Sequence, residues 1–415
     1  MRYLHICILI FCVWISTSAQ NNSLSFYSKN TQDGLSNNWV RCVYQDARGF
    51  MWFGTASGLN RYDGVNFKHY PLNYANINAI ITKDTEHMLI CTDLGAYLYN
   101  IYNHEFSDFD IQADYPILSV AKDNNGLLWF ATSGGLVRYS EHDSVAQLYT
   151  YSEHNTSTIS NNYCNTVIVD DAGTVWVGTK NGLNRFNAST NTFSRYQMHN
   201  TPDLQSNDIL ALAVDYKQRL WVGTARGGVS VFSNPLSVTL TGTRVFQGNA
   251  IALCIDSKNN LWIGRGSGEG LQVINLKDYT SENIPTPIQY KKSVLQKHSL
   301  SDNSIFHIYE DSMGDIWIGT FGGGVNYTSK RIKNFHIIEE YYGANKILSS
   351  NLINCFYQDS HTLWIGTESG LDEWNMQTNT FRSYMNIPGN STSLQGNAVY
   401  AIHKDSQGTL WVGTW

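Results

Sequence analysis

The sequence has few charged residues and no basic run. Lys, Arg, Asp and Glu make up 15% of its 415 residues, against about 25% in an average soluble protein. The 28 basic and 34 acidic residues give a formal net charge of −6. A nucleic-acid-binding chain usually carries a basic stripe on its surface. The composition therefore argues against a nucleic acid as the partner of this chain.

Cysteines are scarce and show no pairing pattern. Cys7 and Cys12 lie near the start of the chain, and five others are scattered without CxxC spacing. An odd number of cysteines without that spacing indicates neither a disulfide framework nor a zinc site. We predict that the five act as small buried hydrophobic residues. They are Cys42, Cys91, Cys164, Cys254 and Cys355.

Long apolar runs are also lacking, with one exception at the start. Arg2 precedes an apolar stretch at residues 4–15, and small residues follow at 16–19. A membrane span needs about 20 apolar residues, so this shorter stretch favours a signal peptide at residues 1–19, cleaved on export. An uncleaved membrane anchor is the alternative. We expect an exported chain whose mature part has no span of its own.

Glycine, asparagine and aromatic residues are abundant instead. The chain has 33 Gly, 41 Asn and 13% aromatic residues, but only 7 Pro. Gly and Asn tolerate a positive φ, so their number predicts many tight turns and argues against a helical bundle. With 42% hydrophobic residues, the chain can bury a substantial core and is not disordered.

One block governs the sequence after residue 34: a Trp, an apolar residue, a Gly and a Thr. It recurs eight times, with Ala131 in place of the Gly in the second of these copies and Arg265 in place of the Thr in the fifth. A degenerate ninth copy at residues 89–92 fills the longest gap. The mean spacing of about 45 residues is the period of a four-stranded propeller blade. The block begins at Trp52, Trp129, Trp176, Trp221, Trp262, Trp317, Trp364 and Trp411.

Each copy can be read as four antiparallel strands. A β-rich run ends at an Asp six residues before the Trp, and this Asp begins an Asp-x-x-Gly hairpin turn in most copies. The Trp strand, a Gly-rich turn and two further strands follow. A single blade cannot bury both of its faces, so the blades must stack into a ring.

These repeats resemble the two-component regulator propeller repeat, nearly letter for letter at residues 33–38, 45–55 and 58–64. The resemblance implies about fourteen repeats in two seven-bladed propellers, then a membrane helix, a histidine kinase, a receiver and a DNA-binding domain. It also implies a periplasmic sensor region, anchored in the inner membrane and homodimeric in the full-length protein. No kinase or receiver sequence is present, so we expect this fragment to be no enzyme and to hold no cofactor.

The fold expected is all-β: a seven-bladed propeller at residues 20–330 and about two blades of an incomplete second one at 331–415. Residues 24–27 match the fourth-strand pattern and are predicted to complete the seventh blade from the other end of the chain. Residues 334–337 would open the second ring. The chain stops after a second strand, which favours a truncation.

Ligand-binding candidates lie on one face of the ring. In an antiparallel blade, the loop entering the first strand and the turn between the second and third strands share a face, and the Asp turns lie on the other. Sugar recognition uses amides, aromatic planes and, for acidic groups, cations. The Asn residues of these loops can equally be turn caps. The candidates are Trp39, Tyr163, Lys180, Arg226, Arg265, Lys291, Lys292 and Phe321.

Arg265 stands where most copies have Thr, and an insertion at residues 278–299 brings further lysines. We expect this insertion on the same face, where Arg265, Lys291 and Lys292 would form a cationic wall that favours an acidic glycan. A tolerated insertion without function is the alternative.

The function expected is the sensing of a soluble oligosaccharide. A glycan-active propeller hydrolase or lyase is one alternative, with Asp208, Asp302 and Glu368 as candidate carboxylates. A surface adhesion or scaffold propeller is another. We predict no catalytic residue and no metal site: HExxH is absent, and the calcium-like run at residues 123–126 occupies a hairpin turn and lacks the distal Glu.

Overall fold

The computed structural model describes residues 24–329, apart from 236, 238, 278, 281–282 and 297, and residues 338, 340–342 and 345–415. The predicted signal peptide and the predicted strand at residues 334–337 lie outside these residues. The described part is all-β, as predicted. Its helical elements are two single 3-10 turns, Thr31–Asp33 and Leu72–Tyr74.

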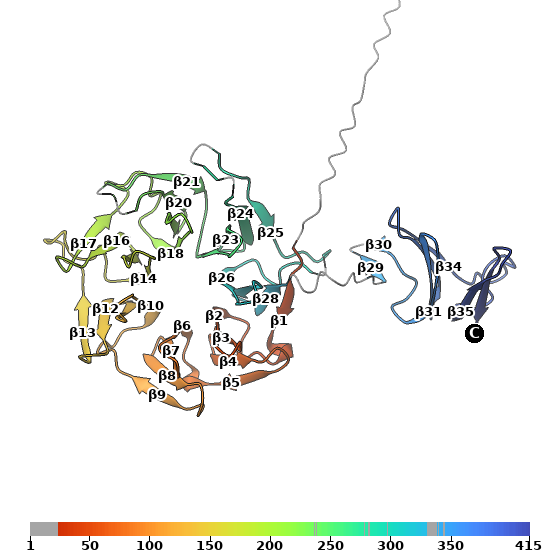
Figure 1. The fold of residues 1–415 in the computed structure, drawn as a ribbon, viewed down its shortest axis with the longest axis horizontal. Coiled ribbons are helices and arrows are strands. Elements are labelled where there is room, and N and C mark those ends of the chain that lie inside the picture. Colours follow the sequence, from red (N-terminus) through yellow and green to blue (C-terminus); the bar gives the residue numbers. More distant parts are fainter. Residues whose placement is uncertain are drawn as a thin grey trace, which may run out of the picture.

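Seven four-stranded antiparallel sheets surround a common centre as the blades of a propeller (Figure 1). In each blade the first strand is innermost and the fourth is outermost. Blades 1 to 3 are β2 (Val40–Gln45), β3 (Met51–Thr55), β4 (Gly58–Tyr62), β5 (Phe67–Tyr70); β6 (Ile77–Thr82), β7 (His87–Thr92), β8 (Ala96–Asn100), β9 (Phe106–Phe109); β10 (Ile117–Lys122), β11 (Leu128–Thr132), β12 (Gly135–Ser140), β13 (Val145–Tyr149).

Blades 4 to 6 repeat this arrangement. They are β14 (Cys164–Val169), β15 (Val175–Thr179), β16 (Gly182–Asn187), β17 (Thr192–Tyr196); β18 (Ile209–Val214), β19 (Leu220–Thr224), β20 (Gly228–Phe232), β21 (Gly242–Phe246); β22 (Ala252–Ile255), β23 (Asn260–Gly264), β24 (Leu271–Asn275), β25 (Ile288–Tyr290).

Blade 7 joins both ends of the ring. It contains β26 (Ile305–Glu310), β27 (Ile316–Thr320) and β28 (Val325–Thr328), and its outer strand is β1 (Tyr27–Lys29), which pairs antiparallel with β28. Next to this strand, Phe26 is only 3% exposed. The predicted closure is confirmed, with the paired strand two to three residues further along the chain than expected.

The degenerate repeat forms a complete blade. Strands β6 to β9 make the same four-stranded sheet as the other copies. Leu89, which replaces the Trp, and Cys91, which replaces the Gly, are both fully buried. The count of seven blades in the first ring is therefore confirmed.

A second unit follows at residues 341–415. It contains a two-stranded ribbon, one four-stranded sheet and a hairpin, as two further repeats predict. Its strands are β29 (Tyr341–Tyr342), β30 (Asn345–Lys346), β31 (Ile353–Asp359), β32 (Thr362–Thr367), β33 (Gly370–Asn375), β34 (Thr380–Tyr384), β35 (Val399–Lys404) and β36 (Leu410–Thr414).

The core lies between neighbouring blades, and this explains the Gly of the repeated block. Cys42 and Trp52 of blade 1 pack in one cluster with Ile77 of blade 2. A Cβ on Gly54 would lie 2.4 Å from the Cys42 sulfur and 2.7 Å from Ile77. At Gly54 the absence of a side chain lets the next blade's inner strand come this close.

The five cysteines of the described part are free thiols. Burial raises the pKa of Cys42, Cys164 and Cys254 to about 12. Such thiols stay protonated and unreactive at neutral pH, which agrees with their interpretation as buried hydrophobic residues.

Candidate functional site

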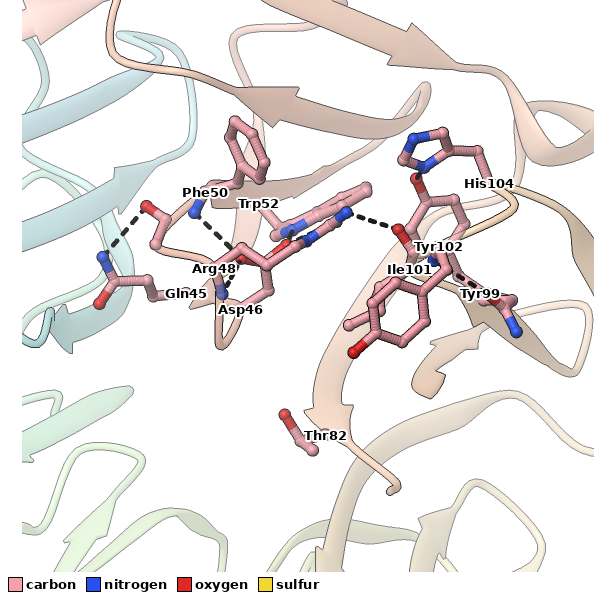
Figure 2. A network of polar contacts seen from close by, with 12 residues as sticks. Gln45, Asp46, Arg48, Phe50, Trp52, Thr82, Tyr99, Ile101, Tyr102 and His104 are labelled. Carbon is pink, nitrogen blue, oxygen red and sulfur yellow. Dashed lines mark hydrogen bonds and ion pairs between the residues drawn. The ribbon is translucent and has the colours of Figure 1, made fainter. Parts of the chain in front are cut away.

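The Asp of each hairpin turn anchors the Trp of its own repeat. In blade 1 the Asp46 carboxylate accepts hydrogen bonds from the Trp52 indole Nε1 at 3.0 Å and from the Phe50 N–H at 3.0 Å, and it pairs with Arg48 (Figure 2). The spacing of six residues was visible in the sequence, but this bond was not predicted. The same Asp–Trp bond joins Asp123 to Trp129, Asp170 to Trp176, Asp215 to Trp221, Asp256 to Trp262, Asp311 to Trp317 and Asp405 to Trp411.

We call the opposite side of the ring the loop face: the side formed by the loops that enter each first strand and by the turns between the second and third strands. Main-chain hydrogen bonds join these two kinds of segment. Lys180 N donates to the Tyr163 carbonyl at 3.0 Å, and Ala56 N donates to the Trp39 carbonyl at 3.1 Å. The structure thus places the two kinds of segment side by side.

The Asn residues of the loop face act as caps. Asn162 Oδ1 accepts a bond from Tyr151 N at 2.6 Å, and Asn303 Oδ1 accepts one from Lys292 N at 2.6 Å. Asn37 accepts a bond from the N–H two residues further on. Their side chains hold the loops between blades in place, so the turn-cap interpretation is the correct one for these residues.

A β-bulge interrupts the first strand at the same point in six of the seven blades. The register between the first and second strands shifts there by one residue. Bulges of this kind redirect a side chain out of the regular sheet. Nothing in the repeat pattern signalled them. The bulged residues are Arg41, Asn78, Leu118, Asn165, Leu210 and Phe306.

Trp39, Phe306 and Phe321 form a cluster that we call the aromatic platform. The centroid of the Trp39 ring lies 4.8 Å from that of Phe321 and 5.7 Å from that of Phe306. Phe321 is 51% exposed. Two predicted candidates therefore meet across the seam between blades 7 and 1, together with Phe306, which sequence reasoning missed.

Arg41 lies beside the aromatic platform. Its guanidinium carbon is 4.7 Å from the Trp39 ring centroid, and its Nε donates to Asn78 Oδ1 at 2.7 Å. Burial lowers the pKa of Arg41, and this effect is partly opposed by Cys42, Asp93 and Tyr163. Tyr163 belongs to blade 4, three positions around the ring from blade 1.

Tyr163 also meets the cation predicted beside it. The Lys180 ammonium lies 3.6 Å from the Tyr163 ring centroid, a cation–π contact. Lys180 itself is exposed. Arg226, in the corresponding turn of blade 5, is exposed as well and has a φ of 66°.

Arg265 is placed differently from the expectation of a cationic wall. Its side chain is only 12% exposed, forms an ion pair with Glu269 and lies 4.6 Å over the Phe246 ring. Burial lowers its pKa. Glu269 therefore compensates the charge of Arg265 within its own turn.

The expected position of the insertion is wrong for its first half. Strand β25 at Ile288–Tyr290 is the outer strand of blade 6 and falls inside the insertion. Pro285 and Pro287 precede it, in the connection from the third to the fourth strand, which lies opposite the loop face. Lys291 and Lys292 follow it on the loop face and are exposed.

An open pocket of about 570 Å³ lies opposite the loop face, under the seam between blades 7 and 1. Gln45 Oε1 accepts a bond from Ser312 N at 2.7 Å there, and the Tyr44 hydroxyl is bonded to Thr82. Figure 2 shows part of its wall, at Gln45, Arg48 and Thr82. Its own polar groups are largely bonded to one another, and the sequence did not point to it.

The seam also holds a half-buried histidine. His307 Nδ1 in blade 7 accepts a hydrogen bond from Val43 N in blade 1 at 3.3 Å. Burial lowers the pKa of His307 to about 4, so the ring stays neutral at physiological pH and can act as an acceptor.

We expect the free energy of unfolding to fall as the pH is lowered from about 6.5 to about 4. In this range an unfolded His307 binds a proton that the folded one does not, and below it both forms are protonated. The loss should be on the order of 2–3 kcal/mol. Urea unfolding of the wild type and of His307→Gln at pH 7 and pH 4.5 measures it. Equal pH dependence in both proteins would contradict the assignment.

In the part of the chain that the structure describes, no three His, Cys, Asp or Glu residues are grouped so that they could hold a metal ion. The same part contains no helix with the length and apolar character needed to cross a membrane.

Two family profiles match the sequence. The one described as the SMP-30/Gluconolactonase/LRE-like region covers residues 43–295, more than half of the chain. The one described as the two component regulator propeller covers residues 299–322, 347–369 and 393–415. The chain belongs to the SMP-30/Gluconolactonase/LRE-like family over residues 43–295, and three of its later repeats match the two component regulator propeller.

A curated relative of this chain is histidine kinase P4 of Formosa agariphila, 27% identical over 184 residues. The match covers 40% of this chain and 13% of the kinase. The chain therefore spans only a small part of that relative.

Solved structures show the same fold at lower identity. The extracellular domain assigned to the hybrid two component system BT4673 from B. thetaiotaomicron has a TM-score of 0.63 and 22% identity, over 94% of this chain and 51% of its own. The corresponding domain of BT3049 gives the same values over 52% of its own chain. Virginiamycin B lyase from Staphylococcus aureus has a TM-score of 0.56 and 12% identity, over 74% of this chain and 98% of its own.

Proposed function

We propose that this two-component regulator propeller is the ligand-sensing region of an exported sensor and that its ligand is an oligosaccharide. The three repeats that match the two component regulator propeller support the sensor role. The signal would pass to a kinase elsewhere in the full-length protein, which we expect to be a homodimer anchored in the inner membrane with this region in the periplasm.

The observation that carries the oligosaccharide proposal is the aromatic platform. A partly exposed aromatic surface beside hydrogen-bonding groups suits the apolar face of a sugar ring. Trp39 and Phe321 interrupt the repeat at this seam, whereas the Asp and Asn residues that recur around the ring hold turns and loops. Residues that the fold does not require are the better candidates for ligand contacts.

A hydrolase or lyase is the second candidate, favoured by the profile match over residues 43–295. Its candidate carboxylates have structural bonds: Asp208 Oδ1 accepts from Asn165, and Asp302 Oδ1 accepts from Ser304 N at 2.7 Å. Glu368 lies in the second unit and accepts from Asn354 and Tyr400. These contacts favour a binding protein over an enzyme.

Calorimetry of the full chain against a panel of acidic and neutral oligosaccharides tests the proposal, with product analysis by mass spectrometry. We expect saturable binding without turnover. Phe321→Ala should weaken binding by about 3- to 10-fold, the value of one aromatic contact.

A matched control is Tyr216→Ala, which removes an exposed aromatic residue on the side opposite the loop face. It should leave the affinity unchanged. Release of smaller sugars would support the hydrolase or lyase instead. If no oligosaccharide of the panel binds, the proposed oligosaccharide sensor is refuted.

A further inference from the structure

Within the part of the chain that the structure describes, Arg41 has no carboxylate partner, in contrast to Arg48, Arg219 and Arg265. Arg48 pairs with Asp46, Arg219 with Asp215 and Arg265 with Glu269. Among the described residues, no carboxylate lies within ion-pair distance of the Arg41 guanidinium group, and its hydrogen bond goes to the neutral amide of Asn78.

Burial lowers the pKa of Arg41, and Asp93 partly opposes this effect from beyond ion-pair distance, but its carboxylate already accepts hydrogen bonds from another residue. Asp93 accepts hydrogen bonds from Asn76 N at 2.8 Å and from Asn76 Nδ2 at 2.6 Å. It holds the start of blade 2 rather than the guanidinium group. A cation that is partly removed from water and not paired is costly, so an anion that binds to Arg41 recovers this free energy.

Arg41 is also held in position. Asn78 Nδ2 donates to the Ile117 carbonyl of blade 3 at 2.7 Å, which directs Asn78 Oδ1 toward the Arg41 Nε. On its other side the guanidinium plane packs on Trp39. With Nε bound, the two terminal nitrogens remain for a ligand, and their planar fork matches a carboxylate.

We propose that Arg41 binds a carboxylate of the ligand while the adjacent aromatic platform receives its sugar ring, so that the ligand is a uronic-acid oligosaccharide. This inference rests on the proposed function and names its substrate class. In this proposal the cation that binds the ligand is Arg41, oriented by Asn78 on the loop face, and not the cationic wall expected around Arg265.

The test uses the full chain and oligosaccharides of galacturonate, mannuronate and guluronate, each with its methyl ester, besides sulfated and neutral oligosaccharides. We expect one of the acids to bind at least about 10-fold more tightly than its ester, which keeps the ring and loses the charge. The affinity for the acid should also fall with added salt. This comparison needs no change in the protein.

Protein variants then locate the anion. Arg41→Ala should weaken binding of the acid by about 10- to 100-fold and remove the preference over the ester, and Arg41→Lys should restore part of it, because the charge remains and the fork is lost. Arg382→Ala, which removes an exposed arginine of the second unit stacked on Tyr384, should have no effect. Melting temperatures show whether each variant is folded.

The outcomes separate this inference from the proposed function. Binding of neutral or sulfated oligosaccharides in preference to every uronate, or an affinity for the acid that Arg41→Ala leaves unchanged, would overturn the inference and leave the sugar sensor standing. Failure of the whole panel to bind would overturn both.

Discussion

A chain that starts at residue 31 is expected to melt at a much lower temperature than one that starts at residue 21. The missing residues supply β1, the outer strand of blade 7, and with it the closure of the ring. The deletion also removes Phe26, which packs in a buried cluster with its ring centroid 5.3 Å from that of Tyr290. The Phe26 N–H donates to the His298 carbonyl at 2.9 Å. Loss of a buried Phe alone costs about 3–5 kcal/mol.

Thermal unfolding of the two chains, followed by circular dichroism, measures this effect. Phe26→Ala in the full chain should reproduce most of the loss, whereas Ser28→Ala, at an exposed position of the same strand, should change the melting temperature little. If the shortened chain melts at the same temperature as the longer one, β1 does not close the ring.

The second large effect is expected from Asp170→Ala, which should lower the free energy of unfolding by about 2–4 kcal/mol. Asp170 accepts a hydrogen bond from the buried Trp176 Nε1 at 3.0 Å and one from Thr174 N at 2.8 Å. Its removal leaves the indole N–H without an acceptor in the core and loosens the hairpin turn. Chemical denaturation of the full chain gives the value.

The chain offers a matched control in the second unit. Asp405 makes the same bond to Trp411 at 2.8 Å, but Trp411 is 62% exposed. Water can replace the acceptor there, so Asp405→Ala should cost far less than Asp170→Ala. Equal losses at the two positions would show that burial of the Trp does not set the value of this bond.

The seam between blades 7 and 1 gathers an aromatic cluster, a half-buried histidine and a pocket. The aromatic platform lies at its loop face, His307 in its wall, and Tyr44 and Tyr309 at the pocket on the opposite side. Here the ring is closed by strands from both ends of its sequence. We expect a ligand bound at this seam to stabilise the closed ring, because it would contact both blades.

Much of the fold could be predicted from the sequence alone. The period of the Trp block, the turn signals and the fourth-strand pattern before the first repeat determined the blade count, the strand order and the closure. They could do so because these features are local and repeated: a turn or a strand is set by a few neighbouring residues, and each copy confirms the others. The shared face of Trp39, Tyr163 and Phe321 followed from the same antiparallel geometry.

The candidate site was determined only by the tertiary structure. Arg265 and Arg41 both lie on the loop face, yet Glu269 neutralises the first, and among the described residues no carboxylate lies within ion-pair distance of the second. The contacts of Phe306 with Trp39, and of Arg41 with Asn78, join strands that are distant in sequence and meet around one centre. The charge and exposure of a side chain are set by such neighbours, which a repeat pattern does not contain.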